Sequence, residues 1–326
     1  MSPVHPTPAQ AQWADAEVGI MITYDLPVFD PTYKPRALRS EQPSPQIFCP
    51  DRLDTEQWIA TAKAAGARYA ILVAKHCSGF CLWPTEAYPY SVRQSPWRAG
   101  QGDIVGDFVR SCARNGLLPG VYYSIDVNDY CGIDRHQHIS GSATAYRQYL
   151  TIVEQQLTEL WTRYGPWFEI WFDGGMPAEH QDVLTRLTEL VAQYQPQAVV
   201  YQGPPQVKSL VRWVGNEQGR APEDCWSTVD TLTPAMIPGT CESRDLSTPD
   251  GRLWAPAEAT MPNRDWHRAF GSGWFWRAGE EHLLYPVDHL VECYRQTVGR
   301  NCNLMLGMVV RSEEHTSELQ SQFRIS

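Results

Sequence analysis

The sequence predicts an α/β fold, and within that class a closed (β/α)8 barrel of the TIM type. Short apolar runs of strand length alternate with longer segments whose apolar residues recur at helical spacing. Such alternation is typical of a parallel sheet covered by helices. About eight strand-like runs lie between residues 13 and 310, and a chain of 326 residues can hold a barrel of roughly 250. A doubly wound sheet is the alternative, but the chain lacks a Gly-x-Gly-x-x-Gly turn.

The first half of the chain predicts three strand–helix units in order. Strands are expected at residues 18–24, 68–74 and 117–124, and helices at residues 55–65, 104–115 and 146–164. Asp54 and Asp103 stand where side chains cap the first N–H groups of a helix. Gly66 and Gly116 stand where helices end in the left-handed conformation. The third helix is expected to stop at Gly165-Pro166.

The second half continues the alternation less regularly. Helices are expected at residues 178–194 and 286–298, strands at 198–201, 211–214 and 303–310, and strand ends at 254–259 and 274–276. Residues 311–326 are polar, have no core-facing periodicity and resemble translated sequencing adapter, so they are expected to form a disordered, non-native tail. The predicted organisation is one barrel over residues 13–310 followed by that tail.

Charge and apolar content argue against two classes of partner. The net charge of −10, without a run of basic residues, argues against nucleic acid. The longest apolar runs are too short to cross a bilayer, and the N-terminus lacks the pattern of a signal peptide. A cytoplasmic protein without a membrane partner is expected, or a periplasmic or secreted one if the native N-terminus lies upstream. The nine cysteines are scattered and are expected to be reduced.

One aromatic stretch ends in residues that a strand would not select. It reads Trp-Phe-Glu-Ile-Trp-Phe-Asp-Gly-Gly over residues 167–175, and its apolar run is typical of a buried strand. In an α/β barrel the residue at the C-terminal end of a strand points into the mouth where catalysis takes place. Asp173 is thus a candidate catalytic carboxylate. The alternative is that it caps a turn or the helix beginning near residue 178.

Five segments along the chain together carry a family resemblance. They are Ala-Lys-His-Cys-Ser-Gly-Phe-Cys-Leu-Trp-Pro at residues 74–84, Gly-Asp-Ile-Val at 102–105 leading into Gly-Val-Tyr-Tyr-Ser at 120–124, the aromatic stretch at 167–175, Arg-Trp-Val-Gly-Asn-Glu at 212–217, and Asn-Cys-Asn-Leu-Met-Leu at 301–306. In this order they resemble the glycoside hydrolase family 29 α-L-fucosidases. The fourth segment is most similar to the α-1,3/4-fucosidase branch.

The resemblance implies an exo-glycosidase that removes terminal α-L-fucosyl residues from oligosaccharides or glycoconjugates, with no cofactor and no metal ion. Retaining enzymes of this kind use two carboxyl groups in a double displacement. Asp173 matches the family's nucleophile, and Glu217 matches the acid/base of the α-1,3/4 branch. A protonated Glu217 requires partial burial against aromatic faces such as Trp213 or Trp226. The alternative is a surface carboxylate paired with Arg220.

The resemblance also implies residues that contact the sugar. His76 matches a histidine that binds sugar hydroxyls, and Trp274 resembles the aromatic wall of the pocket, although either could be a core residue. Glu258 is expected as a further polar contact or a fallback acid, or simply as a solvated carboxylate. The full set of expected substrate contacts is His76, Cys77, Trp83, Tyr123, Trp171, Trp213, Glu258 and Trp274.

The chain departs from the family's pattern in two ways. Thr23 and Cys77 stand where the family has histidines that hold the sugar, and Ser78 stands where it has an aspartate. A site that loses two imidazole donors discriminates sugars differently, so an α-L-galactoside or a modified fucoside is an alternative substrate. The family's C-terminal β-sandwich is expected to be missing or truncated, because residues 311–326 follow the last predicted strand.

Two other functions remain open from the sequence. The first is a barrel that binds carbohydrate with weak or no turnover, which the lost histidines favour and the presence of both carboxylates disfavours. The second is a metal-dependent hydrolase, because His-x-His is a metal-binding spacing. Its ligand set would be His76, Asp126, His136 and His138. No strand is predicted beside the His-x-His pair, which argues against this function.

Overall fold

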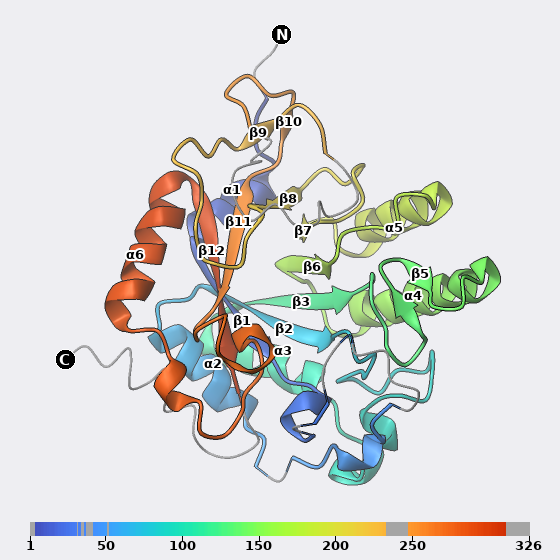
Figure 1. The fold of residues 1–326 in the computed structure, drawn as a ribbon. Helices are drawn as coiled ribbons and strands as arrows, with labels where there is room; N and C mark the ends of the chain where they lie inside the picture. Colours follow the sequence, from blue (N-terminus) through green and yellow to red (C-terminus); the bar gives the residue numbers. More distant parts are fainter. Residues whose placement is uncertain are drawn as a thin grey trace.

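The computed structural model describes residues 4–30, 32–33, 36, 42–50, 52–232 and 247–310. Its centre is a closed barrel of parallel strands in the order β1-β12-β11-β8-β7-β6-β3-β2 (Figure 1). The strands are β1 (Val18–Thr23), β2 (Tyr69–Lys75), β3 (Leu118–Ser124), β6 (Glu169–Asp173), β7 (Val199–Tyr201), β8 (Leu210–Trp213), β11 (Ala257–Pro262) and β12 (Cys302–Val309). The predicted (β/α)8-type barrel is confirmed.

The helices pack against the outside of the strands, except that α1 lies at the N-terminal end of the barrel (Figure 1). They are α1 (Pro8–Ala16), α2 (Thr55–Ala64), α3 (Ile104–Asn115), α4 (Ala143–Arg163), α5 (Gln181–Tyr194) and α6 (Val287–Thr297). Helix α1 was not predicted; it begins at a capping box in which the Thr7 side chain accepts from the Gln10 N–H. Residues 202–209 join β7 to β8 without an α-helix, so the strand–helix alternation is incomplete.

Local sequence explains the predicted ends of α2 and α3. The Asp54 carboxylate caps α2, and Asp103 Oδ1 accepts from the Gly106 N–H of α3 at 2.9 Å. Helix α3 ends at Gly116, whose φ of 72° lies in the left-handed region. Glycine adopts that conformation without steric cost. The boundaries of α2 and α3 are therefore explained by residues at their own ends.

One predicted strand position is wrong, and a second is confirmed only in part. Residues 274–276 form a turn that follows a 3-10 turn, η5 (Phe270–Gly273), because Gly271 and Gly273 take left-handed φ values of 56° and 80° and curl the chain. The run at 254–259 is divided instead between two sheets. Its first part belongs to β10 (Leu253–Trp254), which pairs with β9 (Thr228–Val229), and barrel strand β11 begins only at Ala257.

A small hairpin was also not predicted. Strands β4 (Ile133–Asp134) and β5 (Gln137–His138) pair antiparallel after β3. The two residues of its turn, Arg135 and His136, have positive φ values of 47° and 58°. This is the turn geometry that matches the twist of a two-residue hairpin, although it usually selects glycine or asparagine.

The core has an inner and an outer layer. The inner layer fills the barrel with residues that include Met21, Tyr69, Ile71, Val73, Tyr122, Phe168, Trp171, Tyr201 and Met305. Trp13, from helix α1, is 1% exposed and closes the N-terminal end of this layer. The outer layer lies between the strands and the helices. A barrel filled in this way leaves its open space at the C-terminal end of the strands.

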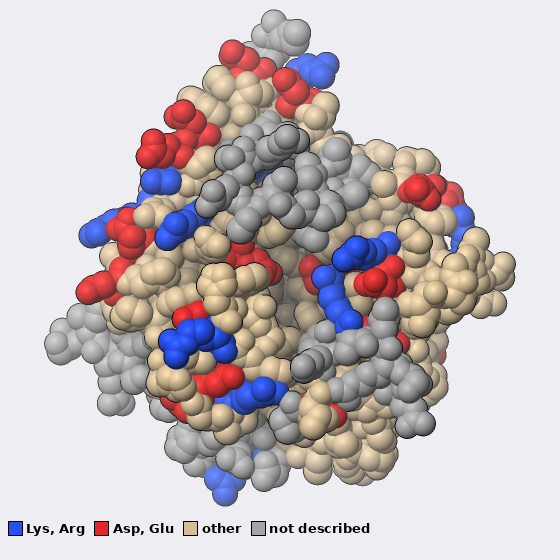
Figure 2. All heavy atoms as spheres, in the orientation of Figure 1, with Lys and Arg blue, Asp and Glu red and all other residues tan. Residues whose placement is uncertain are grey.

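The surface carries charges of both signs. In the orientation of Figure 1, the molecule is hollowed near the middle of the face shown, and acidic and basic side chains border the hollow (Figure 2). Among the described residues, no helix combines the length and apolar composition needed to cross a membrane. The eight cysteines in the described ranges are free thiols. The predicted tail, residues 311–326, lies outside the described residues, so its disorder and the loss of a β-sandwich stay predictions.

Candidate active site

A pocket opens at the C-terminal ends of the barrel strands, where α/β barrels carry their active sites. Its volume is about 400 Å³. The lining residues are Arg36, His76, Cys77, Trp171, Asp173, Tyr201, Gln202, Trp213, Glu217, Thr260, Gly271, Ser272, Trp274 and Phe275. A smaller space of about 60 Å³ shares several of these residues and is also lined by Met21, Thr23, Val73 and Tyr122. Most of the residues that the sequence singled out therefore meet at one site.

Asp173 is the last residue of β6 and faces the pocket. The Tyr122 hydroxyl donates a hydrogen bond to Asp173 Oδ2 at 2.5 Å. Gly174 follows with a φ of 77°, and a Cβ at that position would lie 2.0 Å from Asp126 Cγ. The glycine after the carboxylate is thus required both by its left-handed backbone and by the side chain packed against it.

Glu217 lies in the loop after β8 and is half-buried. The Trp266 indole donates from Nε1 to Glu217 Oε2 at 2.8 Å. Burial raises the pKa of Glu217, the Trp266 hydrogen bond opposes that effect, and the nearby Asp173 charge raises the pKa further. A carboxyl group that keeps its proton is suited to act as a general acid. The surface pair with Arg220 that the sequence left open is not what surrounds this carboxyl.

Four rings from neighbouring strands form a continuous stack across the base of the site. Tyr201 stacks on Trp171 with ring centroids 4.1 Å apart, Trp171 stacks on Tyr122 at 5.0 Å, and Tyr122 stacks on His76 at 5.9 Å. Three of these rings line the 400 Å³ pocket and the fourth, Tyr122, lines the smaller space. The stack covers both faces of Trp171 and Tyr122, so it forms a rigid base for the pocket and presents ring edges to it.

Two buried glutamates support this stack from inside the barrel. Glu258 accepts from Trp171 Nε1 at 2.8 Å and from the Tyr69 hydroxyl at 3.3 Å, and Glu169 accepts from Trp13 Nε1 at 2.8 Å. Glu169 Oε1 has no hydrogen-bond donor among the described residues, but it belongs to a carboxyl that interacts directly with Glu258. Two carboxyl groups in contact must share a proton. Burial raises the pKa of Glu258 to about 7 and holds that of Glu169 well above its usual range.

Arg36 brings a positive charge to the pocket. Its guanidinium donates to Asp126 Oδ2 at 3.0 Å, and its backbone N–H donates to Asp129 Oδ2 at 3.1 Å. Burial raises the pKa of Asp126 to about 7, with a further contribution from Asp173, while Arg36 opposes the shift. The side chain of Arg36 is 48% exposed, so it can move without disturbing the core.

Three of the predicted substrate contacts do not line the pocket. The Trp83 indole is fully buried and donates to Glu159 Oε2 of α4 at 2.8 Å, and the Tyr123 hydroxyl donates to Gln156 Oε1 of α4 at 2.7 Å. Both face the layer between strands and helices. Glu258 is also fully buried and supports Trp171 from below. These three expectations are corrected, because the side chains point away from the pocket or lie beneath its floor.

Sequence reasoning selected Tyr123 and missed its neighbour Tyr122. In the register of β3 with β6, Tyr122 pairs with Trp171 and Ser124 pairs with Asp173, so these residues share the inner face. Side chains alternate along a strand, and the inward direction of Asp173 would have assigned the same face to Tyr122 once the register was known. Arg36 and Trp266 were also missed. Both lie in irregular segments without a periodic signal.

Thr23 and Cys77, which stand in place of the expected histidines, both face the site. Thr23, at the end of β1, is 3% exposed and lines the smaller space, and Cys77 is 2% exposed and lines the pocket. Ser78 is also buried, and its hydroxyl donates to Asp25 Oδ1 at 2.9 Å. The first two substitutions therefore change the chemistry of the pocket wall, whereas Ser78 bonds one oxygen of a buried carboxylate.

The ligand set proposed for a metal-dependent hydrolase is not brought together. His136 Nε2 bonds the Gly174 carbonyl at 3.1 Å, and His138 Nδ1 bonds the Ser140 hydroxyl at 2.7 Å in the β4–β5 hairpin. Within the described ranges, the one close group of three potential metal ligands is a different set: His76, Cys77 and Asp173. Burial lowers the pKa of His76 to about 4, so this imidazole is neutral near pH 7.

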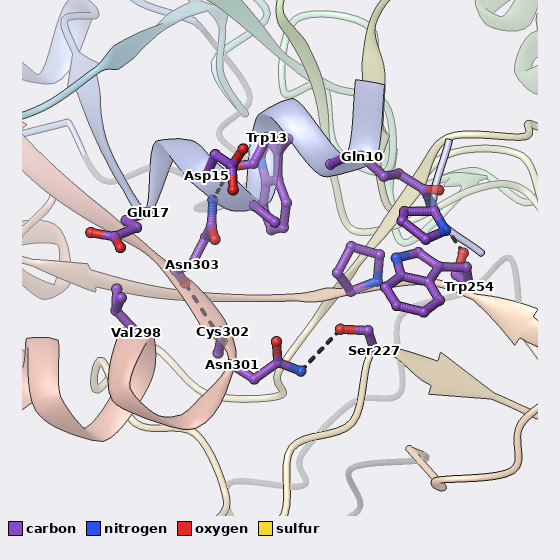
Figure 3. Close-up of a pocket in the computed structure, with 14 residues that line it drawn as sticks. Gln10, Trp13, Asp15, Glu17, Ser227, Trp254, Val298, Asn301, Cys302 and Asn303 are labelled. Atoms are coloured by element: carbon purple, nitrogen blue, oxygen red, sulfur yellow. Dashed lines mark hydrogen bonds between the residues drawn. The ribbon is translucent and has the colours of Figure 1, made fainter. Parts of the chain in front are cut away.

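A second cavity of about 260 Å³ lies at the opposite, N-terminal end of the barrel, between α1 and the start of β12 (Figure 3). Its polar groups bond to one another: Gln10 Nε2 donates to the Trp254 carbonyl at 3.0 Å, and Asn301 Nδ2 donates to the Ser227 hydroxyl at 3.0 Å. Asn303 Nδ2 donates to the Trp13 carbonyl at 2.7 Å. The Asn303 bond attaches α1 to barrel strand β12 and the Gln10 bond attaches it to β10. This end of such barrels serves stability.

Comparison with known proteins gives a consistent result. A family model described as Alpha-L-fucosidase matches residues 10–323. The chain is 34% identical to alpha-L-fucosidase 1 from Arabidopsis thaliana over 325 residues, which is 97% of this chain and 58% of the relative. A Bacteroides thetaiotaomicron structure, assigned as a candidate alpha-L-fucosidase, superposes with a TM-score of 0.86 at 35% identity and covers 98% of this chain and 75% of that one. The chain spans less than two thirds of the length of the Arabidopsis relative.

Proposed function

Because this chain belongs to the α-L-fucosidase family, we propose that it hydrolyses terminal α-L-fucosyl residues of oligosaccharides or glycoconjugates by a retaining mechanism. The observation that carries the proposal is the pairing of Asp173 and Glu217 in one pocket. Asp173 ends β6 and accepts from the Tyr122 hydroxyl, and Glu217 lies in the loop after β8 and accepts from the Trp266 indole. A carboxyl group whose pKa is raised is suited to the acid role, which leaves the other carboxyl as the nucleophile.

In the proposed first step, the Asp173 carboxylate attacks the anomeric carbon. Glu217 gives its proton to the glycosidic oxygen, the bond between that oxygen and the anomeric carbon breaks, and the aglycone leaves as an alcohol. In the second step, the Glu217 carboxylate takes a proton from water, and the resulting hydroxide displaces Asp173 from the anomeric carbon. Two inversions give net retention, for which the two carboxyl groups should approach to about 5–5.5 Å.

The other pocket residues have supporting roles in this proposal. Tyr122 orients Asp173 through the 2.5 Å hydrogen bond, and Trp266 orients Glu217. His76 and Trp274 would bind the sugar, whereas Trp171, whose two faces are covered by Tyr201 and Tyr122, would present only its ring edge. No step requires a metal ion or a cofactor.

The test is hydrolysis of an aryl α-L-fucoside, with the anomer of the first product followed by NMR. Wild-type protein should release the α-anomer. Asp173→Ala should reduce turnover to background. Glu217→Ala should lose about 10²–10⁴-fold with a poor leaving group; with an activated aryl fucoside, azide should restore its turnover by replacing water as the nucleophile of the second step. Glu223→Ala is a control, since that carboxylate is 90% exposed further along the same loop. Release of the β-anomer, or an active Asp173→Ala variant, would refute the mechanism.

A second candidate substrate is an α-L-galactoside. Thr23 and Cys77 replace two imidazoles that are expected to grip sugar hydroxyls, and the 60 Å³ space beside Thr23 leaves room that a larger side chain would fill. Comparing kcat/KM for aryl α-L-fucoside and α-L-galactoside decides between these sugars. Binding of several glycosides without hydrolysis of any would instead support the carbohydrate-binding barrel.

A further inference from the structure

Three side chains of different chemistry converge at the base of the pocket. One ligand atom each from His76, Cys77 and Asp173 can be chosen so that all three lie within 4.8 Å of one another. The His76 Nε2 to Cys77 Sγ distance is 3.9 Å. Zn²⁺ binds imidazole nitrogen at about 2.0–2.1 Å and thiolate sulfur at about 2.3 Å, which places N and S about 3.6 Å apart in a tetrahedral site. Small side-chain adjustments would bring this trio to that geometry.

The trio is held in place by its neighbours. Tyr122 stacks on the His76 ring and also donates to Asp173 Oδ2, so one residue positions two of the three groups. Cys77 follows His76 directly and is 2% exposed. In addition, His76 Nδ1 is buried and has no hydrogen-bond partner among the described residues. An imidazole that is neutral and incompletely bonded is available as a ligand.

We propose that His76, Cys77 and Asp173 form a binding site for a thiophilic divalent cation such as Zn²⁺, with the fourth position open to water in the pocket. Such a cation should also inhibit glycoside hydrolysis, because it would occupy the Asp173 nucleophile and block the sugar site. This inhibition rests on the proposed function. Hard cations such as Mg²⁺ prefer oxygen ligands and should not compete. The site depends on Cys77.

Arg36 sets a limit on the affinity. Its guanidinium lies close to the Cys77 thiol and to the Asp173 carboxylate, and it bonds Asp126. A fixed positive charge opposes a divalent cation, so binding should be weaker than at a structural zinc site. Because the Arg36 side chain is 48% exposed on a loop, it can turn outward. Arg36→Met should therefore tighten metal binding severalfold.

The binding test uses Co²⁺ as a spectroscopic probe in place of Zn²⁺. Titration of the full chain should give one bound ion with a thiolate-to-cobalt charge-transfer band and visible bands of tetrahedral intensity. Cys77→Ala should abolish the charge-transfer band, and His76→Ala and Asp173→Asn should each weaken binding at least tenfold. Cys131→Ala, which removes a thiol outside the pocket lining, is the matched control and should behave like wild type.

A second measurement guards against misfolded variants. Zn²⁺ should raise the Tm of wild-type protein, by the usual coupling of ligand binding to stability, and should not raise the Tm of Cys77→Ala. A charge-transfer band that survives in Cys77→Ala, or that disappears only in Cys131→Ala, would overturn the proposal. So would the absence of any Co²⁺ spectrum or Zn²⁺-induced shift at millimolar metal.

The inhibition test separates the two proposals. Zn²⁺ should slow aryl α-L-fucoside hydrolysis, a chelator should restore the rate, and the inhibition constant should increase at least tenfold in Cys77→Ala relative to that variant's own metal-free rate. If Co²⁺ binds as expected but no glycoside is hydrolysed, the proposed function fails and the metal site stands. If glycosides are hydrolysed but neither metal binds, the metal site fails alone.

Discussion

The hydroxyl of Tyr122 on β3 donates to Oδ2 of Asp173 on β6 at 2.5 Å. The strand register pairs Tyr122 with Trp171 and places Asp173 beside Ser124, so the tyrosine reaches diagonally toward the strand ends. The same phenol ring is stacked between Trp171 and His76. One side chain thus joins the aromatic floor to the proposed nucleophile and fixes the direction in which that carboxylate points.

Tyr122→Phe should lower kcat/KM for an aryl α-L-fucoside by about 10–100-fold, because a hydrogen bond to a charged group contributes ~1.5–3 kcal/mol. The ring stack remains, so the Tm should change little. Tyr123→Phe is the matched control on the same strand: it removes a hydroxyl bonded to Gln156 outside the pocket and should keep wild-type kcat/KM. Equal kinetic losses in the two variants would argue against a role for Tyr122 in orienting Asp173.

The pH profile should have a basic limb set by Glu217. Burial raises the pKa of this carboxyl, so the protonated acid persists above the usual range of glutamate, and kcat/KM should fall as pH rises through the raised value. Trp266→Phe removes a hydrogen bond that favours the ionised form, and should move this limb to higher pH. Trp226→Phe, at an indole that is 45% exposed, should leave it in place. A limb that shifts to lower pH in Trp266→Phe would contradict the assignment.

The buried glutamate pair should make the protein less stable as pH rises. Burial raises the pKa of Glu258 to about 7, so between the unfolded value of 4.5 and that pH the folded state keeps a proton that the unfolded state has lost. Each such proton costs about 1.4 kcal/mol per pH unit. The stabilisation that this proton gives is therefore fully present below about pH 4.5 and is lost as pH rises through the folded pKa of about 7. Asp25 and Asp126, whose pKa values are also raised to about 7, act in the same direction.

Glu169→Gln isolates the contribution of the pair. The glutamine amide can donate to Glu258 without a titrating proton, and its carbonyl can still accept from Trp13. The loss of unfolding free energy between about pH 5.5 and pH 8, measured by urea denaturation, should be smaller than in wild type by ~1–3 kcal/mol. Glu154→Gln, at a carboxylate that is 42% exposed, should reproduce the wild-type pH dependence. An unchanged slope in Glu169→Gln would exclude a shared proton.

Gly307 on β12 should affect the site through packing alone. A Cβ at this position would lie 2.5 Å from Cζ3 of Trp274 and 3.2 Å from the Pro262 Cα. Overpacking of this kind costs about 1–3 kcal/mol, and the rigid indole that must shift to relieve it lines the pocket. Gly307→Ala should therefore raise KM severalfold and lower the Tm. Gly299→Ala, where a Cβ meets no atom within 4 Å, should preserve KM, and an unaltered KM in Gly307→Ala would show that Trp274 does not contact substrate.

The elements that could be predicted are those whose signals are local. Asp103 and Gly116 bracket α3, and the structure begins and ends the helix where these residues require. Alternating strands and helices were sufficient to indicate a barrel, because a parallel sheet of this size buries its edges by closing. Helix α1 was not predicted because its apolar pattern is weak. Its position depends on a tertiary contact, the insertion of Trp13 into the end of the barrel.

Site residues could be predicted only where they end a strand or match a motif. His76, Asp173 and Glu217 were found in that way, and they line one pocket. Trp83 and Tyr123 carry the same kind of local signal and face the outer layer instead. Tyr122 and Tyr123 are adjacent on β3, so their side chains point to opposite faces of the sheet. Both are tyrosines, and only the strand register shows which one faces the pocket.

By itself, the sequence determined the barrel, the helix caps, and a carboxylate followed by glycines at the end of a strand. Those features depend on backbone propensities and side-chain period, which act over a few residues. Only the tertiary structure decided that Tyr122 bonds Asp173, that Glu258 supports Trp171 from below, and that Arg36 and Cys77 share a wall of the pocket. The reason is that inward and outward faces, and the meeting of distant loops, are set by strand register and barrel closure rather than by neighbours along the chain.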